Sequence, residues 1–147
     1  MFFGAFEHSL DTKNRLSIPS KFREVIEKSS NPTKVFITLG LDECLFLFSA
    51  DQWERVVASF SSMPFTDEAT RDFNRLFFHG TVDADLDAQG RILIPENLKV
   101  HAGLAKNVTL IGVNQYIELW DRDKWAQRKA KLSGKYEVLA QQLKPGH

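Results

Sequence analysis

Cysteine, net charge and long apolar runs are all scarce in this chain, and each scarcity excludes a class of protein. The single cysteine, Cys44, excludes an internal disulfide, and its place in the run "CLFLF" predicts a buried core thiol. The 19 basic and 19 acidic side chains balance, which disfavours a surface covered with phosphate-binding charge but leaves room for a local basic patch. No apolar run approaches the ~20 residues of a membrane-spanning helix, and no signal-peptide pattern opens the sequence. We therefore expect a soluble, cytoplasmic protein that does not enter a membrane.

The sequence contains an internal duplication. The stretch "LDTKNRLSIP" (10–19) recurs as "LDAQGRILIP" (86–95), and "FITLGLDECLFLFSADQW" (36–53) matches "VTLIGVNQYIELWDRDKW" (108–125). The offset changes from 76 to 72 residues, which places the length difference in the loop "KSSNPTK" (28–34) and aligns Gly40 with Gly112. We expect a first repeat at 1–62, a linking helix within 63–78, and a second repeat with a C-terminal helix at 79–147.

The same elements are predicted in both repeats. An extended stretch leads to the repeated Asp-x-x-x-Arg loop, then to a short strand that ends at Pro19 or Pro95, a short helix, a pair of strands and a closing helix. A capping box at Ser49 begins the closing helix of the first repeat, and Gly134 predicts a kink in the C-terminal helix. Units of about 70 residues bury a small fraction of their surface and are only marginally stable alone. We therefore expect an α+β fold in which two halves interleave as a pseudo-dimer, share one small barrel and bring their loops to a common face.

The loop needs an unusual backbone conformation just before an arginine. Asn14 precedes Arg15 in the first copy, and Gly90 precedes Arg91 in the second. Glycine adopts positive φ freely, and asparagine is among the few other residues that do so routinely. The exchange of asparagine for glycine therefore predicts a tight turn with positive φ, from which each arginine projects at a defined place.

Each loop also carries an aspartate four residues before its arginine, Asp11 or Asp87. Such a carboxylate either caps the turn through backbone N–H groups or pairs with the guanidinium. The spacing alone fits two interpretations, a turn that is merely held shut and an arginine that is presented to a partner. The first loop carries Lys13 and is followed by Lys21 and Arg23, whereas the second loop carries Gln89 and is followed by Glu96. Lysines around an oriented arginine favour contacts with phosphates and guanine edges.

The stretches "FGAFEHSLDTKNRLSIPSKFRE" (3–24), "LDAQGRILIP" (86–95) and "YIELWDRDKW" (116–125), in this order, resemble the MraZ family of bacterial transcriptional regulators. The resemblance extends to about Trp125. It implies the swapped-hairpin β-barrel of the wider SpoVT/AbrB-like group. It also implies a repressor that binds double-stranded DNA at direct repeats upstream of its own operon, in the division and cell-wall gene cluster, and that assembles into a ring-shaped homo-oligomer.

The resemblance also assigns residues. The DNA-contact motif of the family maps onto Asp11, Lys13, Asn14 and Arg15 and, in the second copy, onto Asp87, Gly90 and Arg91. With the nearby lysine included, we expect DNA contacts from Lys13, Asn14, Arg15, Lys21 and Arg91, and an orienting role for Asp11, Asp87 and Gly90. The chain departs from the family pattern in two places: Asn14 replaces a glycine, and Phe3 replaces an arginine.

Two other classes of function compete with DNA binding. An enzyme would need a catalytic or metal-binding constellation, but the histidines show no ligand spacing and do not recur between the repeats: His8, His79, His101 and His147. We therefore expect no catalysis, no cofactor and no small-molecule substrate. An assembly or adaptor protein that never touches DNA would equally explain the aromatic helices, whose stripes form either a core or an interface between copies.

Overall fold

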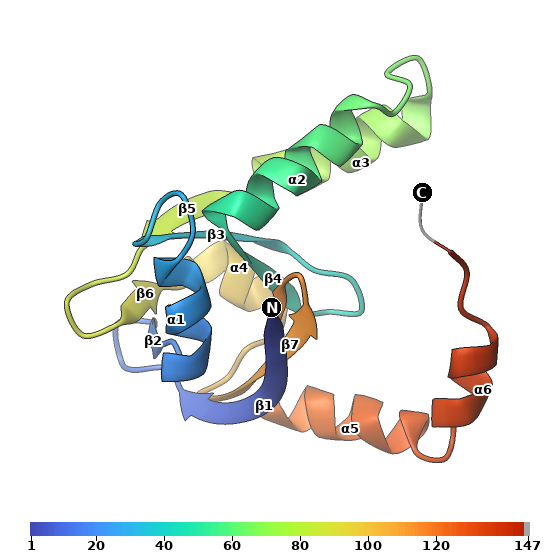
Figure 1. The fold of residues 1–147 in the computed structure, drawn as a ribbon. Coiled ribbons are helices and arrows are strands. Elements are labelled where there is room, and N and C mark those ends of the chain that lie inside the picture. Colours follow the sequence, from blue (N-terminus) through green and yellow to red (C-terminus); the bar gives the residue numbers. More distant parts are fainter. Residues whose placement is uncertain (146–147) are drawn as a thin grey trace.

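The computed structural model describes residues 1–145 and shows a mixed α+β fold (Figure 1). The main sheet is antiparallel, with strand order β1–β7–β8–β4–β3–β5, and β2 and β6 form a separate two-stranded ribbon. The strands are β1 (Phe2–Ser9), β2 (Arg15–Ser17), β3 (Lys34–Leu39), β4 (Leu45–Ser49), β5 (Val82–Asp85), β6 (Arg91–Leu93), β7 (Asn107–Asn114) and β8 (Ile117–Asp121). The helices are α1 (Ser20–Glu27), α2 (Ala50–Ser61), α3 (Glu68–His79), α4 (Glu96–His101), α5 (Arg122–Leu132) and α6 (Tyr136–Gln141).

The two repeats exchange strands around a pseudo-two-fold axis. β1 of the first repeat pairs with β7 of the second, and β5 of the second pairs with β3 of the first. In the ribbon, Leu16 faces Ile92, which is the same position in the other repeat. At the centre of the main sheet, Phe46 faces Glu118, again a repeat-matched pair. These two pairs lie on the axis, and the predicted interleaving of the halves is confirmed.

The main sheet is not closed into the barrel that we expected. Within residues 1–145, β1 and β5 are the edges of the sheet and do not pair with each other. The chain leaves the sheet after Leu10 and after Leu86. Their N–H groups donate at 2.8 Å to the carbonyls of Lys106 and Thr33, which immediately precede the neighbouring strands β7 and β3. β2 and β6 then pair only with each other. The result is a sheet and a ribbon that enclose one core, to which both repeats contribute.

Strand register corrects the alignment of the two repeats. Ser49 and Asp121 are equivalent, because each caps the helix that follows its strand. Ser49 faces Val35 and Asp121 faces Val108, so these two valines match at an offset of 73 rather than 72. Gly112 therefore corresponds to Leu39, and the alignment with Gly40 was wrong. Three residues of the length difference lie before β3 and one lies in the β3–β4 turn.

Local sequence signals explain where the helices begin and end. The Ser49 hydroxyl accepts from the N–H of Gln52 at 3.4 Å, and the Asp121 carboxylate accepts from two N–H groups at the start of α5. Gly134, with φ of 75°, separates α5 from α6, so the C-terminal helix is interrupted where the glycine predicted a kink. Among residues 1–145, no helix has the length and apolar character needed to cross a membrane.

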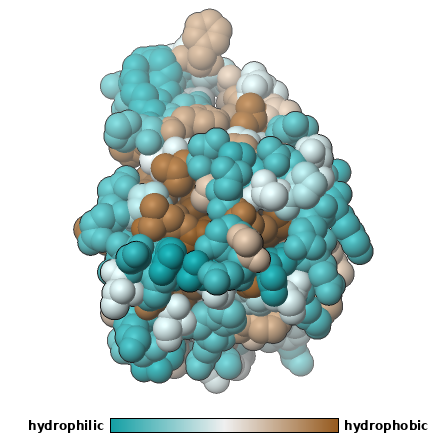
Figure 2. All heavy atoms as spheres, turned by 90° about the vertical axis from the view of Figure 1, so that its left-hand side faces the viewer, coloured by the Kyte–Doolittle hydropathy of each residue, from teal (hydrophilic) through white to brown (hydrophobic). Residues whose placement is uncertain are grey.

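Helices α2 and α3 form an arm that projects from the sheet (Figure 1). Aromatic rings hold the arm together and attach it to β3: Trp53 stacks on Phe36 at 5.1 Å, and Phe60 packs on Phe77 at 5.1 Å between ring centroids. Figure 2 shows apolar atoms in the middle of one side of the molecule and at its top, where the arm ends. Cys44 immediately precedes β4 and is fully buried, as its apolar sequence neighbours predicted.

Candidate nucleic-acid interface

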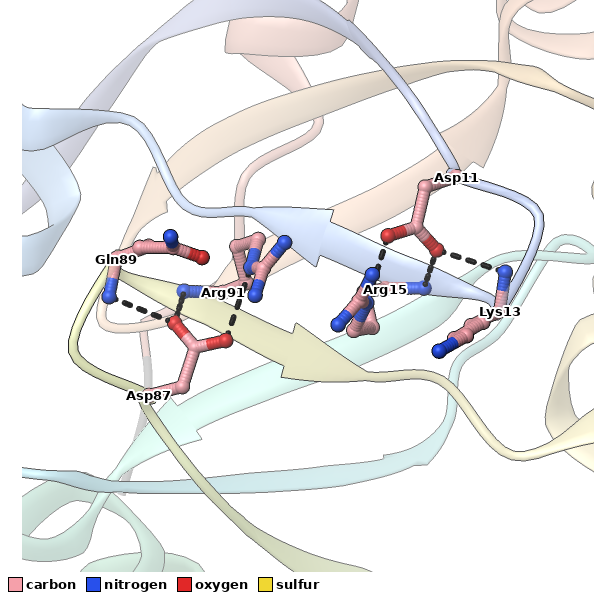
Figure 3. Close-up of polar contacts among 6 residues, drawn as sticks. All are labelled: Asp11, Lys13, Arg15, Asp87, Gln89 and Arg91. Atoms are coloured by element: carbon pink, nitrogen blue, oxygen red, sulfur yellow. Dashed lines mark hydrogen bonds and ion pairs between the residues drawn. The ribbon is translucent and has the colours of Figure 1, made fainter.

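The β2–β6 ribbon displays both arginines on one face. Arg15 pairs with Leu93 and Arg91 pairs with Ser17, and all four side chains point away from the core, which Leu16 and Ile92 enter from the other face. The side chains of Arg15 and Arg91 are 35% and 27% exposed. Because the pairing is antiparallel and repeat-matched, the two arginines are related by the pseudo-two-fold axis (Figure 3).

The first turn is organised by Asp11. One carboxylate oxygen of Asp11 accepts from the N–H groups of Lys13 and Arg15 at 2.9 and 2.8 Å, and the other accepts from Arg15 Nε at 2.7 Å. One side chain thus closes the turn and fixes the guanidinium. The Arg15 backbone N–H is the main cause of a lowered pKa of Asp11, whose carboxylate stays ionised at neutral pH.

The second turn repeats this geometry with Asp87. Its carboxylate accepts from the N–H groups of Gln89 and Arg91 and from Arg91 Nε, each at 2.9 Å (Figure 3). The hydrogen bond from the Arg91 N–H is again the main cause of a lowered pKa of Asp87. Both alternatives that the spacing allowed for the aspartate, capping the turn and pairing with the arginine, are realised by the same carboxylate.

The backbone of both turns has the predicted conformation. Asn14 has φ of 59° and Gly90 has φ of 74°. The N–H of each donates to the carbonyl of the turn's aspartate, at 3.0 and 2.9 Å. The exchange of asparagine for glycine is therefore explained by the left-handed conformation that the turn requires.

Each turn is supported by a helix of the other repeat. The Asn14 amide donates to Glu96 at 3.0 Å and accepts from the Lys99 ammonium at 3.1 Å, both on α4. Arg23, on α1, lies against Gly90 and donates from Nε to the Ile18 carbonyl at 3.0 Å. Each turn is thus in contact with the short helix of the opposite repeat.

The remaining candidates lie at different places. Lys13 is exposed at the tip of the first turn. Lys21, at the start of α1, lies over the ring of Phe3 at 4.7 Å, and within residues 1–145 its ammonium forms no hydrogen bond or ion pair with either turn. The structure thus brings Lys13, Asn14 and Arg15 together with Arg91 across the ribbon and places Lys21 on a neighbouring helix that packs against β1.

Two basic residues beside the first turn were not identified as candidate site residues from the sequence. Lys99 and Lys106 line a shallow hollow together with Asp11 and Asn14. Both belong to the second repeat, and their proximity to the first loop follows only from the strand exchange. A signal for Lys99 was present, because it occupies the position that Arg23 has in the first repeat, 76 residues earlier.

The described part of the chain contains no cluster of three or more histidine, cysteine, aspartate or glutamate side chains with the geometry of a metal site. The chemistry at the ribbon is instead that of two guanidinium groups, each held by a carboxylate, with the ammonium groups of Lys13 and Lys99 beside the first turn. Such groups bind anions and the acceptor edges of bases.

Known proteins resemble this chain over nearly its whole length. The family model described as "MraZ protein, putative antitoxin-like" matches the chain twice, over residues 1–76 and 77–141. A protein of Acetivibrio thermocellus named transcriptional regulator MraZ is 43% identical over 143 residues, which cover 97% of this chain and 96% of that protein. The two matches to the family model fit the two interleaved repeats of the structure. On the full-length similarity and the doubled match, the chain belongs to the MraZ family.

Proposed function

We propose that this chain is a sequence-specific DNA-binding regulator that contacts DNA through the outward face of the β2–β6 ribbon. The observation that carries the proposal is the pair of arginines on this ribbon, each held by an aspartate and related by the pseudo-two-fold axis. The major groove of B-DNA admits a two-stranded β-ribbon. A two-fold arrangement also suits a duplex, in which the backbones run antiparallel.

The arginines provide the specific contacts in this proposal. Asp11 and Asp87 engage the Nε atoms, and within residues 1–145 the terminal nitrogens of Arg15 and Arg91 have no hydrogen-bond partner. A guanidinium oriented in this way presents its terminal N–H groups for bidentate contact with guanine O6 and N7 or with a phosphate.

The surrounding residues have supporting roles. Lys13 neutralises a phosphate next to Arg15, and Asn14 holds the turn at which the backbone approaches DNA. Lys21 contributes a more distant phosphate contact, and its position over Phe3 supplies positive charge where the family pattern has an arginine. The repeats at 1–62 and 79–147 each provide one arginine, and residues 63–78 link them.

Assembly explains how a chain with no net charge binds DNA. We propose a homo-oligomeric ring, in which several copies engage several direct repeats upstream of the chain's own operon, in the division and cell-wall gene cluster, and repress it. Linking weak sites raises overall affinity by roughly 10²–10⁴ without new contacts in each copy. In this proposal the protein acts in the cytoplasm at the nucleoid, without a cofactor, catalysis or a small-molecule substrate.

The proposal is tested by fluorescence anisotropy with a labelled duplex from upstream of the chain's own gene, against a scrambled duplex, over a salt series. Wild type should prefer the native duplex, and log K should fall linearly with log salt. Arg15→Ala should weaken binding by about tenfold to 100-fold, as expected for the loss of one bidentate base contact.

Arg75→Ala provides the matched control, because Arg75 is an exposed arginine on α3 that pairs with Asp72. It should leave affinity unchanged, and light scattering should give the same mass for all three proteins. Equal weak binding to both duplexes, or equal effects of the two substitutions, would contradict the proposal. A loss of mass in Arg15→Ala would instead favour the alternative of an assembly or adaptor protein.

A further inference from the structure

An apolar hollow lies where the α2–α3 arm meets the main sheet. It has a volume of about 370 Å³. Its lining is almost entirely aliphatic and aromatic and includes Leu41, Phe46, Phe60, Phe73, Leu76 and Phe77. Leu41 and Leu76 are 60% and 65% exposed and Phe73 is 42% exposed, so much of this apolar lining faces solvent in the single chain. Exposed apolar surface of this kind marks a binding site on a soluble protein.

Helix α6 and the residues just after it carry a second apolar surface, which has no partner within residues 1–145. Tyr136 and Leu139 lie on one side of α6, Leu143 follows just beyond its C-terminal end, and the three side chains are 86%, 43% and 81% exposed. Figure 1 shows α6 standing clear of both the sheet and the arm. Gly134 connects it to α5 through a turn around which the structure is open, with no atom within 4 Å of the place of a β-carbon.

The two surfaces are complementary in charge. The arm, residues 50–80, carries five acidic and three basic side chains, whereas residues 122–145 carry seven basic and two acidic ones. Within the described chain, several lysines of this tail form no ion pair: Lys129, Lys131 and Lys135. An apolar, acidic arm and an apolar, basic tail therefore face solvent on the same molecule.

The tail is held away from the hollow of its own chain. Lys124 and Arg128 of α5 lie 3.1 and 3.8 Å from Glu43 and Asp42 of the β3–β4 turn, which fixes the direction of α5. The 11 residues of α5 then extend outward for about 16 Å before α6 begins. This geometry favours a second copy of the chain as the partner of α6.

We propose that α6 of one copy docks in the α2–α3 hollow of the next copy, so that Tyr136, Leu139 and Leu143 pack against the apolar lining of that hollow. Donor and acceptor surfaces differ, so the contact is heterologous, and its repetition generates a ring when the rotation closes. The inference rests on the proposed homo-oligomer and specifies its interface; it does not depend on the DNA contacts.

Cysteine cross-linking between two different copies tests the contact. Ser59 lines the hollow, and Ala140 lies on α6 next to Leu139 and one turn after Tyr136; both are exposed in the single chain. Chains with Ser59→Cys are mixed with longer, tagged chains that carry Ala140→Cys, and are oxidised. A cross-linked band of the summed mass is expected.

Ser61→Cys, at an exposed position of the same helix outside the hollow, is the matched control and should give no such band. Cys44 is buried and does not interfere.

Light scattering provides the second readout. Leu139→Asp should lower the mean mass by half or more, because it places a charge in the apolar contact. Val138→Asp should leave the mass unchanged, because Val138 is exposed and lies outside the side of α6 formed by Tyr136 and Leu139. Circular dichroism checks that both variants keep their fold. A cross-link only within a double-cysteine chain, or an undiminished mass in Leu139→Asp, would overturn the inference while leaving the proposed oligomer in place.

The controls separate this inference from the proposed function. If wild type is a monomer, both the oligomer and its interface are overturned, and Arg15→Ala on a single-repeat duplex still judges the DNA contacts. If Leu139→Asp loses mass but binds one repeat as wild type does, the interface and the ribbon are independent, as proposed.

Discussion

The guanidinium group of Arg23 lies directly against the α-carbon of Gly90. A β-carbon at this glycine would lie 2.7 Å from both Cδ and Nη1 of Arg23. In the other turn, the repeat-matched Lys99 leaves room for the Asn14 side chain and hydrogen-bonds it at 3.1 Å. The two turns share a backbone conformation, but only the first has space for a side chain, because the supporting helices differ.

Substitutions at the two turn positions should therefore have unequal effects. Gly90→Asn should lower the free energy of unfolding by about 1–2 kcal/mol, since Arg23 must move and lose its hydrogen bond to Ile18. Asn14→Gly should lower it by less than about 1 kcal/mol, because glycine adopts the positive φ freely and only exposed or half-buried hydrogen bonds are lost. Urea denaturation of both variants provides the measurement.

A double substitution tests the cause. Adding Arg23→Ala to Gly90→Asn should recover part of the lost free energy of unfolding. The double variant should therefore be more stable than the sum of the two single effects predicts. Equal losses in the two single variants, or strictly additive effects in the double variant, would show that contact with Arg23 is not what excludes a side chain at position 90.

Acid should remove the contribution of the two aspartates. The pKa values of Asp11 and Asp87 are lowered, chiefly by backbone hydrogen bonds from Arg15 and Arg91, so each carboxylate stabilises the fold above its unfolded pKa. This contribution is lost as pH falls through the lower folded pKa. The variant Asp11→Asn/Asp87→Asn should be less stable than wild type at neutral pH, and the difference should shrink between about pH 5 and pH 2.

The measurement is urea denaturation across that pH range. Asp72→Asn is a suitable control, because Asp72 pairs with Arg75 on the surface of α3 and is remote from both turns. The free energy of unfolding of Asp72→Asn should change with pH in the same way as that of wild type. A difference between wild type and the double variant that stayed constant down to pH 2 would contradict the assignment.

The contribution of Glu118 to stability should depend on pH in the opposite sense to that of the two aspartates. Burial is the main cause of its raised pKa, and its carboxylate also accepts from Trp120 Nε1 at 3.0 Å. A raised folded pKa gives stability that is present below the unfolded value near 4.5 and is lost as pH rises through the folded value. Glu118→Gln keeps an acceptor for Trp120 and removes the half-buried charge, so it should stabilise the protein at pH 7.

Comparison of thermal unfolding at pH 4 and pH 7 decides the point. The stabilisation by Glu118→Gln should be largest at pH 7 and should disappear near pH 4, where the native carboxyl is neutral as well. A Glu118→Gln variant that is less stable than wild type at pH 7 would show that the charge is compensated in the fold.

The sequence predicted those features that depend on short stretches of chain. Positive φ at Asn14 and Gly90, the Ser49 cap and the break at Gly134 each follow from the chemistry of one or two residues. Features set by pairing between distant strands were less accessible. The contact of Asn14 with Lys99 needs both the strand exchange and the register of the ribbon. The open edges of the sheet likewise reflect where the chain turns out of β1 and β5, which no local pattern specifies.

The last prediction concerns the unequal charge of the two turns in the proposed DNA contact. Lys13 and Gln89 are both exposed, and the N–H of each donates to its turn's aspartate at 2.9 Å, so side-chain charge is the main difference between them. Lys13→Gln should remove a phosphate contact, so that the fall of log K with log salt becomes less steep by about one unit. Gln89→Lys should make this fall steeper by a similar amount. Because a phosphate contact carries no sequence information, both variants should keep the ratio of native to scrambled affinity. Stability should not change in either, since the turn hydrogen bonds come from the backbone. If Lys13→Gln reduced this ratio instead, Lys13 would contact a base edge, and the first turn would lie deeper in the groove than the second.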